Sequence, residues 1–162
     1  MNAIAVVDKN WGLGLGGKLL VHMPGDLRYF KEKTLGKTIV IGRGTFESMS
    51  GRPLAGRETV ILTKNENYSA PCPVVHSLDE ALERFKDIRS EDLFIAGGEA
   101  VYKLFFPYCD KFFITKLYKS FAADRYFPDL DGAPGEFEAK AVSGVMEENN
   151  VEYQFFEYAR IK

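Results

Sequence analysis

Short apolar runs rich in valine and isoleucine alternate along the chain with segments of helical periodicity. This alternation predicts an α/β fold with a mostly parallel central sheet and helices on both faces. We expect strands at 3–7, 38–41, 58–62, 74–75, 93–96 and 112–116, and helices at 24–34, 45–49, 77–86 and 99–106. The segments 137–142 and 152–158 are also strand-like, and the stretch 147–150 between them is typical of a hairpin tip. The C-terminal part therefore adds an antiparallel edge strand or hairpin to the sheet.

The bulk composition suits one domain that covers residues 1–162, with 46% hydrophobic and 27% charged residues. A net charge of -2 argues against a nucleic-acid-binding surface. No apolar run approaches the roughly 20 residues of a membrane span. The two cysteines are too few for a disulfide framework or a metal site. We therefore expect a cytoplasmic monomer that binds no metal, nucleic acid or membrane.

The glycine-rich segment 12–18 matches two phosphate-binding patterns on paper, a dinucleotide fingerprint and a near P-loop. Both patterns need a helix directly afterwards, because the N–H groups at its start hold the phosphates. Here the continuation 19–24 is typical of extended chain, and Leu19 stands where a P-loop has Ser or Thr. Two interpretations remain open, a flexible surface loop and a mobile flap over a site.

Two strand-to-helix transitions are better candidates for a nucleotide site. Gly97 and Gly98 follow a predicted buried strand and open a helix, which allows a pyrophosphate to approach the backbone; close helix–sheet packing is the alternative. The stretch 41–45 repeats this arrangement and places Arg43 near its start. Thr63 and Lys64 end the next strand. A cofactor ribose without a phosphate would favour a carboxylate near such a strand end, whereas Arg43 and Lys64 favour a 2′-phosphate and hence NADPH over NADH. The alternative, that both are solvated surface cations, explains the pattern equally well.

The carboxylate of Asp26 lies at the start of a predicted helix whose apolar face includes Leu27 and Phe30. An aspartate there is often a helix cap or a first-turn charge, which is the alternative to a functional role. No second carboxylate pairs with Asp26, so glycosidase chemistry has no support. His22 and His76 lie far apart in sequence without a nucleophile motif, so neither a catalytic triad nor a metal site is indicated.

Taken together, these segments resemble the dihydrofolate reductase family of the single-chain bacterial type over nearly the whole chain. The matching stretches, in order, are 3–7, 11–14, 23–31, 41–49, 51–57, 95–102, 114–115 and 126–128. Their order and spacing carry the resemblance more than any one stretch. It implies NADPH-dependent reduction of 7,8-dihydrofolate to tetrahydrofolate, by hydride transfer to C6 and protonation at N5, and binding of antifolate-type small molecules.

The resemblance also implies residue roles. Asp26 and Thr115 are the expected catalytic pair, with Asp26 orienting and polarising the pteridine while the N5 proton arrives through water. Arg57 is expected to clamp the glutamate tail, residues 13–19 to form a flap, and Asp124 to contact that flap. The substrate-binding set is Ile4, Ala5, Asp26, Leu27, Phe30, Met49, Leu54, Arg57, Ala96 and Thr115. The cofactor-binding set is Val6, Leu13, Gly14, Lys18, Leu19, Gly42, Arg43, Gly44, Thr45, Leu62, Thr63, Lys64, Gly97, Gly98, Glu99, Ala100, Val101 and Tyr102.

The sequence departs from the family pattern in two places. Leu20 and Val21 stand where the family usually has Pro-Trp, so a side-chain donor that helps to hold an ordered water is missing. Ala96 replaces a larger aliphatic residue. The competing predictions are another NADPH-dependent reductase on the same fold, the pyrimidine reductase of riboflavin synthesis, and a non-catalytic nucleotide-binding module.

Overall fold

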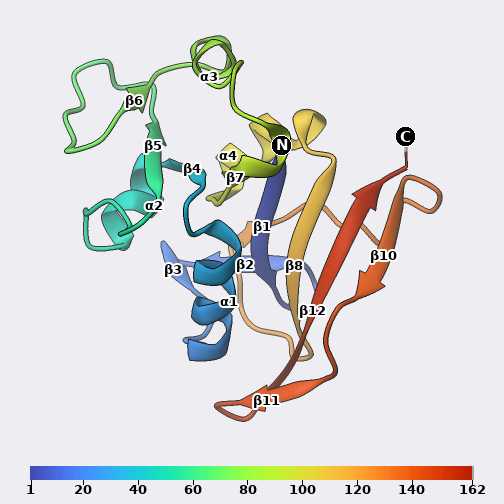
Figure 1. The fold of residues 1–162 in the computed structure, drawn as a ribbon. Coiled ribbons are helices and arrows are strands. Elements are labelled where there is room, and N and C mark those ends of the chain that lie inside the picture. Colours follow the sequence, from blue (N-terminus) through green and yellow to red (C-terminus); the bar gives the residue numbers. More distant parts are fainter. Residues whose placement is uncertain (162) are drawn as a thin grey trace.

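The main sheet is a mixed sheet of nine strands, described here from a computed structural model that covers residues 1–161 (Figure 1). Its strands are β1 (Asn2–Val7), β4 (Thr38–Gly42), β5 (Glu58–Leu62), β6 (Val74–Val75), β7 (Leu93–Ile95), β8 (Lys111–Leu117), β10 (Phe137–Ala141), β11 (Met146–Glu148) and β12 (Val151–Arg160). Their order is β10-β12-β8-β1-β7-β4-β5-β6, and β11 pairs with β12. The six strands from β8 to β6 in this order run parallel, whereas β12 is antiparallel to β8. The predicted parallel core with an antiparallel C-terminal edge is confirmed.

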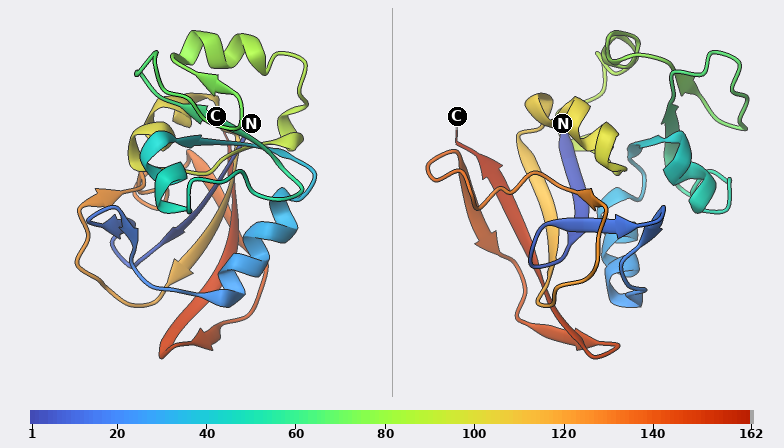
Figure 2. Two further views of the ribbon diagram at one scale, coloured as in Figure 1. Left: turned by 90° about the vertical axis from the view of Figure 1, so that its left-hand side faces the viewer. Right: turned by 180° about the vertical axis from the view of Figure 1, so that it is seen from behind.

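Helices cover both faces of this sheet, as the alternating pattern predicted. They are α1 (Pro24–Thr34), α2 (Arg43–Ser48), α3 (Leu78–Arg84) and α4 (Glu99–Phe105), with short 3-10 turns at Ser90–Asp92 and Phe106–Tyr108. Tyr29 of α1 packs with Ile4 and Ile39, while Phe105 of α4 packs with Ala5 on the other face. Figure 2 shows α1 running alongside the strands and both termini at the same end of the sheet. No helix within residues 1–161 has the length and apolar character that a membrane crossing requires.

The alternation of side chains along β1 divides the core into two parts. Ala3, Ala5 and Val7 belong to the larger cluster, whereas Ile4 and Val6 point to the opposite face. This follows from the two-residue period of a strand. The face with Ile4 and Val6 is the one that α1 covers, and it carries the candidate site.

The glycine-rich segment is more regular than the loop that the sequence indicated. It forms a hairpin of β2 (Gly12–Leu15) and β3 (Lys18–Leu19), and β2 also pairs with β9 (Arg125–Tyr126), which the sequence analysis missed. Asp124 contacts this hairpin as expected. Its Oδ2 accepts from the Gly16 N–H at 3.2 Å, and its own N–H donates to the Gly14 carbonyl at 2.9 Å.

The C-terminal hairpin differs in detail from the prediction. Asn149 and Asn150 make the turn, with φ of 52° and 62°, but they join β11 to β12 and not β10 to β12. Asparagine tolerates this left-handed region, which two-residue hairpin turns need. The strand β10 pairs with β12 further along, from Phe137 opposite Arg160 to Ala141 opposite Phe156. The hairpin of β11 and β12 therefore projects beyond β10.

Candidate active site

The loops that leave β4 and β7 meet at one edge of the sheet. The carboxyl ends of parallel strands share an edge, and open α/β sheets bind ligands there. The Gly42 N–H donates to the Gly97 carbonyl at 2.9 Å, and the peptide bond between Gly97 and Gly98 is cis. A Cβ on Gly98 would lie 3.2 Å from the Thr45 hydroxyl. The two glycine-containing loops that the sequence singled out are therefore neighbours.

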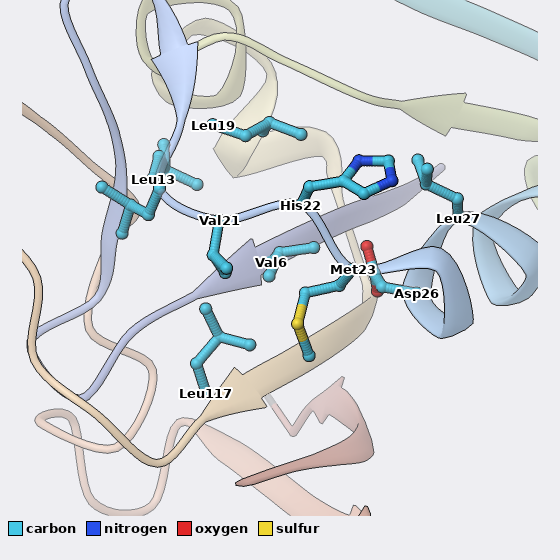
Figure 3. A pocket seen from close by; sticks show the side chains of 10 residues that line it. Val6, Leu13, Leu19, Val21, His22, Met23, Asp26, Leu27 and Leu117 are labelled. Atoms are coloured by element: carbon cyan, nitrogen blue, oxygen red, sulfur yellow. The ribbon is translucent and has the colours of Figure 1, made fainter. Parts of the chain in front are cut away.

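Asp26 lies in a pocket between α1, the ends of β1 and β8, and the β2–β3 hairpin. Figure 3 shows its carboxylate beside Val6 and Met23. The residues that line this pocket are Val6, Leu13, Leu19, Leu20, Val21, His22, Met23, Asp26, Leu27 and Leu117. Asp26 is only 9% exposed, so this apolar lining leaves it largely without solvent.

The Asp26 side chain bonds across the pocket and does not cap its own helix. The Thr115 hydroxyl donates to Asp26 Oδ1 at 2.6 Å, and this is the one donor to the carboxylate among residues 1–161. The N-cap of α1 is Met23, which has no side-chain capping bond. The helix-cap alternative for Asp26 is therefore wrong. One carboxylate oxygen remains available to a ligand with N–H donors.

Burial shifts the protonation of this carboxylate. Desolvation raises the pKa of Asp26 from 3.8 to about 6, against the hydrogen bond from Thr115, which lowers it. The negative charge of Glu148 adds a smaller upward contribution to this pKa. The carboxyl of Asp26 therefore reaches the midpoint between its acid and its anion in mildly acidic solution, where a solvated aspartate is already ionised.

The remaining expected substrate residues form an apolar wall that continues from α1 to residue 57. Phe30, Leu54 and Ala96 pack against the cluster that contains Ile4. Met49 packs with Ala96 in the adjoining cluster. The side chain of Ala5 is an exception, because it lies in the core on the other face of the sheet.

Arg57 is held beside this wall. Its guanidinium donates to the Ala55 carbonyl at 3.0 and 2.9 Å and to the Thr34 hydroxyl at 3.4 Å, and its carbon lies 5.9 Å from the centre of the Phe30 ring. Partial burial lowers the pKa of Arg57. Among residues 1–161, no carboxylate forms an ion pair with Arg57. The carbonyl of Ala55 and the hydroxyl of Thr34 therefore orient its side chain.

Tyr102 connects α4 to the first strand. Its buried hydroxyl donates to the Ile4 carbonyl at 2.6 Å, which fixes the Tyr102 ring against β1. Val101 is also buried, whereas Ala100 is exposed. The Glu99 carboxylate is engaged elsewhere, since it accepts from the Tyr126 N–H at 2.8 Å.

The cationic side chains of Arg43 and Lys64 follow the carboxyl ends of β4 and β5. Arg43 is exposed, 3.5 Å from a Glu47 oxygen, and its carbon is 5.5 Å from the centre of the Tyr68 ring. Lys64 is exposed after β5, and the Thr63 hydroxyl accepts from the Asn65 N–H at 3.2 Å. The exposure of Arg43 and Lys64 agrees equally with a phosphate site and with solvated surface charges.

Several other expected cofactor residues lie in the Asp26 pocket, on the β2–β3 hairpin or against the main core. Leu13 and Leu19 line the pocket with Asp26, whereas Lys18 is exposed on β3. Gly14 pairs within the hairpin, and Leu62 packs against the main core. The structure thus brings together the Asp26 side and the glycine loops, with Lys18 and Lys64 at the periphery.

Sequence reasoning missed part of the pocket lining. Met23, His22 and Leu117 were not selected, although each has a positional signal. Met23 directly precedes the helix that carries Asp26. Leu117 is two residues after Thr115 on the same strand, so its side chain faces the same side.

A mostly parallel sheet with two neighbouring glycine-containing loops at one edge, and a buried carboxylate in an adjacent ligand-sized pocket, is typical of the class of small α/β nucleotide-binding enzymes. The family model "Dihydrofolate reductase" matches residues 1–160, and the chain belongs to the dihydrofolate reductase family. It is thus an NADPH-dependent oxidoreductase that reduces dihydrofolate, as the sequence predicted.

Individual relatives agree with this assignment. The chain is 37% identical to dihydrofolate reductase of Bacillus subtilis (strain 168) over 160 residues, which are 97% of this chain and 92% of that one. It is 31% identical to the enzyme of Staphylococcus haemolyticus over 164 residues, covering 100% and 96% of the two chains. A solved structure of dihydrofolate reductase from Enterococcus faecalis complexed with NADP(H) and RAB-propyl matches with a TM-score of 0.85 and 37% identity. That match covers 99% of this chain and 96% of that one.

Proposed function

We propose that Asp26 and Thr115 form the pteridine-binding pair of this reductase. The observation that carries the proposal is the buried hydrogen bond of 2.6 Å between them, in a pocket with otherwise apolar walls. Thr115 occupies Oδ1 of Asp26 and fixes the carboxylate plane. Each carboxylate oxygen has two lone pairs, so both oxygens can still accept, one from the 2-amino group and the other from N3 of the ring, as a pair of parallel hydrogen bonds.

The chemistry assigned to Asp26 is orientation and polarisation. A carboxyl with a pKa of about 6 keeps its proton up to a pH at which a fully solvated aspartate has already lost it. Asp26 thereby favours the ring tautomer that is protonated at N5, and water delivers that proton. Val21 has no side-chain donor to hold such a water, so in this proposal Asp26, with the hydroxyl of Thr115 bonded to it, is the polar anchor of the ring.

The glycine loops suit NADPH. A Cβ on Gly44 would meet no heavy atom within 4 Å, so the backbone there is open to a ligand at the start of α2. We assign the adenosine-side phosphates to Gly44, Thr45 and Thr63, and the pyrophosphate to the segment 97–101. When bound, NADPH supplies the hydride that reduces C6 of the substrate. Leu13, Leu19 and Tyr102 exclude water from the inner end of this cleft and hold the reacting rings together.

Arg43 and Lys64 are proposed to select the 2′-phosphate, and Arg57 the α-carboxylate of the glutamate tail. Guanidinium groups bind phosphate and carboxylate with two parallel hydrogen bonds, which favours arginine at both ends of the site. Arg57 is already oriented by Ala55 and Thr34, so binding costs it little side-chain entropy.

The test is oxidation of NADPH by dihydrofolate, followed by absorbance, in wild type and in Asp26→Asn. Asp79→Asn on the exposed side of α3 is the matched control, because it makes the same chemical change away from the cleft. We expect Asp26→Asn to lose roughly 100-fold or more of kcat/KM at neutral pH, and Asp79→Asn to match wild type. Full turnover of dihydrofolate by Asp26→Asn would overturn the assignment.

We further propose that the enzyme works as a cytoplasmic monomer and that it binds antifolate-type inhibitors in the Asp26 pocket. Both cysteines, Cys72 and Cys109, are free thiols, which fits a reducing compartment. One chain contributes every group assigned to the site. Light scattering coupled to gel filtration should give a mass close to 18.3 kDa, and a dimer mass would contradict the monomer.

A further inference from the structure

The hairpin of β11 and β12 reaches across the molecule to the start of α1. Glu148 Oε1 accepts from the Gly25 N–H at 2.8 Å, and the Asn149 side-chain amide donates to the His22 carbonyl at 2.7 Å. More than 120 residues of sequence separate the partners in each contact. The two contacts flank Met23 and Pro24, so the hairpin holds the segment that leads into the helix of Asp26.

The contact from Glu148 satisfies a specific need of α1. The first N–H groups of a helix have no partner within the helix, and a negative charge is favourable at that end. Met23, at the N-cap, offers no side-chain acceptor, and the N–H groups of Asp26 and Leu27 both turn to the Met23 carbonyl. The Gly25 N–H is therefore left to Glu148, which acts as a cap supplied from a distant strand.

The packing at Gly25 is too close for any other residue. A Cβ on Gly25 would overlap the Tyr153 hydroxyl and would lie 3.2 Å from Glu148 Oε1. Tyr153 is itself buried, so it has little room to move away. Gly25 directly precedes Asp26, and a displacement of the hairpin would consequently move the first turn of α1 and the carboxylate with it.

We propose that Glu148 is a positioning residue for Asp26: it anchors the first turn of α1 through the Gly25 N–H and places a second negative charge beside the residue that directly precedes Asp26. The inference rests on the role proposed above for Asp26 and adds a residue outside the pocket to it. Glu148 does not line the pocket, so it acts through Gly25 and through its field.

The electrostatic part agrees with the surroundings of Asp26. Glu148 contributes to raising the pKa of Asp26, after burial. The other titratable or charged groups around this carboxylate are Tyr29 and Arg28 on its own helix, Tyr102 on α4, Tyr153 on β12 and His22 on the preceding loop. Thr115 on β8 is neutral. Apart from Asp26 itself, Glu148 is the carboxylate whose charge acts on this site. Removing that charge therefore lowers the pKa of Asp26.

Two substitutions separate the two parts of the proposal. Glu148→Gln keeps an oxygen that can accept from the Gly25 N–H but removes the charge. Glu148→Ala removes both. The neighbouring Glu147→Gln is the control, because Glu147 is exposed on the same strand and makes the same change of charge. The measurement is kcat/KM for dihydrofolate against pH, since its profile reports ionisations of the free enzyme.

We expect the alkaline fall of kcat/KM in Glu148→Gln to move to lower pH by about half a unit, with KM nearly unchanged. Glu148→Ala should show the same shift and, in addition, a several-fold higher KM, because the first turn of α1 loses its anchor. Glu147→Gln should follow wild type. A profile of Glu148→Gln that coincides with that of Glu147→Gln would overturn the electrostatic role, and an unchanged KM in Glu148→Ala would overturn the anchoring role.

Asp26→Asn keeps this test distinct from that of the proposed function. If Asp26→Asn retains turnover, the role of Asp26 itself is wrong. If Asp26→Asn loses turnover while both Glu148 variants behave as wild type, the inference about Glu148 alone is wrong.

Discussion

Replacement of Asp26 by Asn should make the ligand-free protein more stable at neutral pH while it removes activity. The native pocket holds a carboxylate whose pKa is about 6, against 3.8 in an unperturbed chain. Burial therefore disfavours the anion in the native state relative to the unfolded state. An amide of the same shape carries no charge and can still accept the hydrogen bond from Thr115.

The size of the effect follows from the pKa difference. About 2 pKa units at about 1.4 kcal/mol each give a cost of about 3 kcal/mol for the ionised carboxylate in the folded protein. Below about pH 4 the Asp26 carboxyl is protonated in both the folded and the unfolded state. The wild type then keeps all of the stability that ionisation of Asp26 removes at higher pH. Between about pH 4 and pH 6 the unfolded chain loses its proton first, so the wild type loses stability as the pH rises. The variant has no proton to lose at this position, so its advantage grows over the same range.

The assay is urea unfolding of both proteins without ligands, at intervals from about pH 4 to pH 8. The free energies of unfolding are subtracted at each pH, which removes the titration of all other groups that the proteins share. We expect the difference in favour of Asp26→Asn to rise by about 3 kcal/mol at most across this range and to level off above about pH 7. A difference that stays constant with pH, or that falls as the pH rises, would refute the reasoning about the buried carboxylate.

Three further predictions concern the neighbours of this group and the cofactor end. Thr115→Val should raise the pKa of Asp26 by about one unit, because it removes a hydrogen bond to the charged form, and the alkaline fall of kcat/KM should move to higher pH; a move to lower pH would contradict this. Gly25→Ala should lower the free energy of unfolding by about 1–3 kcal/mol in urea, since its Cβ overlaps the Tyr153 hydroxyl, and Tyr153→Phe should recover part of the loss. Arg43→Gln should raise KM for NADPH roughly tenfold and leave KM for NADH unchanged, and equal effects on both cofactors would exclude a contact with the 2′-phosphate.

Local patterns in the sequence were sufficient for most of the fold. The alternation of valine-rich runs with helical periodicity located the six parallel strands and all four helices to within a few residues. The helix expected at 77–86 has Ser77 as its N-cap, with Ser77 Oγ accepting from the Glu80 N–H at 3.0 Å. The prediction of these elements is correct because the patterns that mark them lie within a few consecutive residues.

The elements that were missed depend on partners far away in sequence. Strands β2, β3 and β9 are short; β2 is half glycine, and the residues of β3 and β9 are all exposed, so neither propensity nor alternation marks them. They pair because Asp124 and the β2–β3 hairpin come together in the folded chain. The strand β11 was missed because it is also short, whereas β10 lies where the segment 137–142 was predicted to be a strand.

The site illustrates the same limit at the level of single residues. Asp26 in isolation has the pattern of a first-turn helix charge, and the sequence offers no measure of whether its side chain turns toward the helix or the sheet. The answer depends on Thr115, 89 residues away, and on Glu148, which takes over the Gly25 N–H. Because Glu148 supplies the acceptor at this end of α1, Asp26 is free to bond across the pocket. In this protein an aspartate that resembles a cap is free to bind a ligand because another residue performs the capping. That residue is Glu148, which lies on a hairpin more than 120 positions further along the chain.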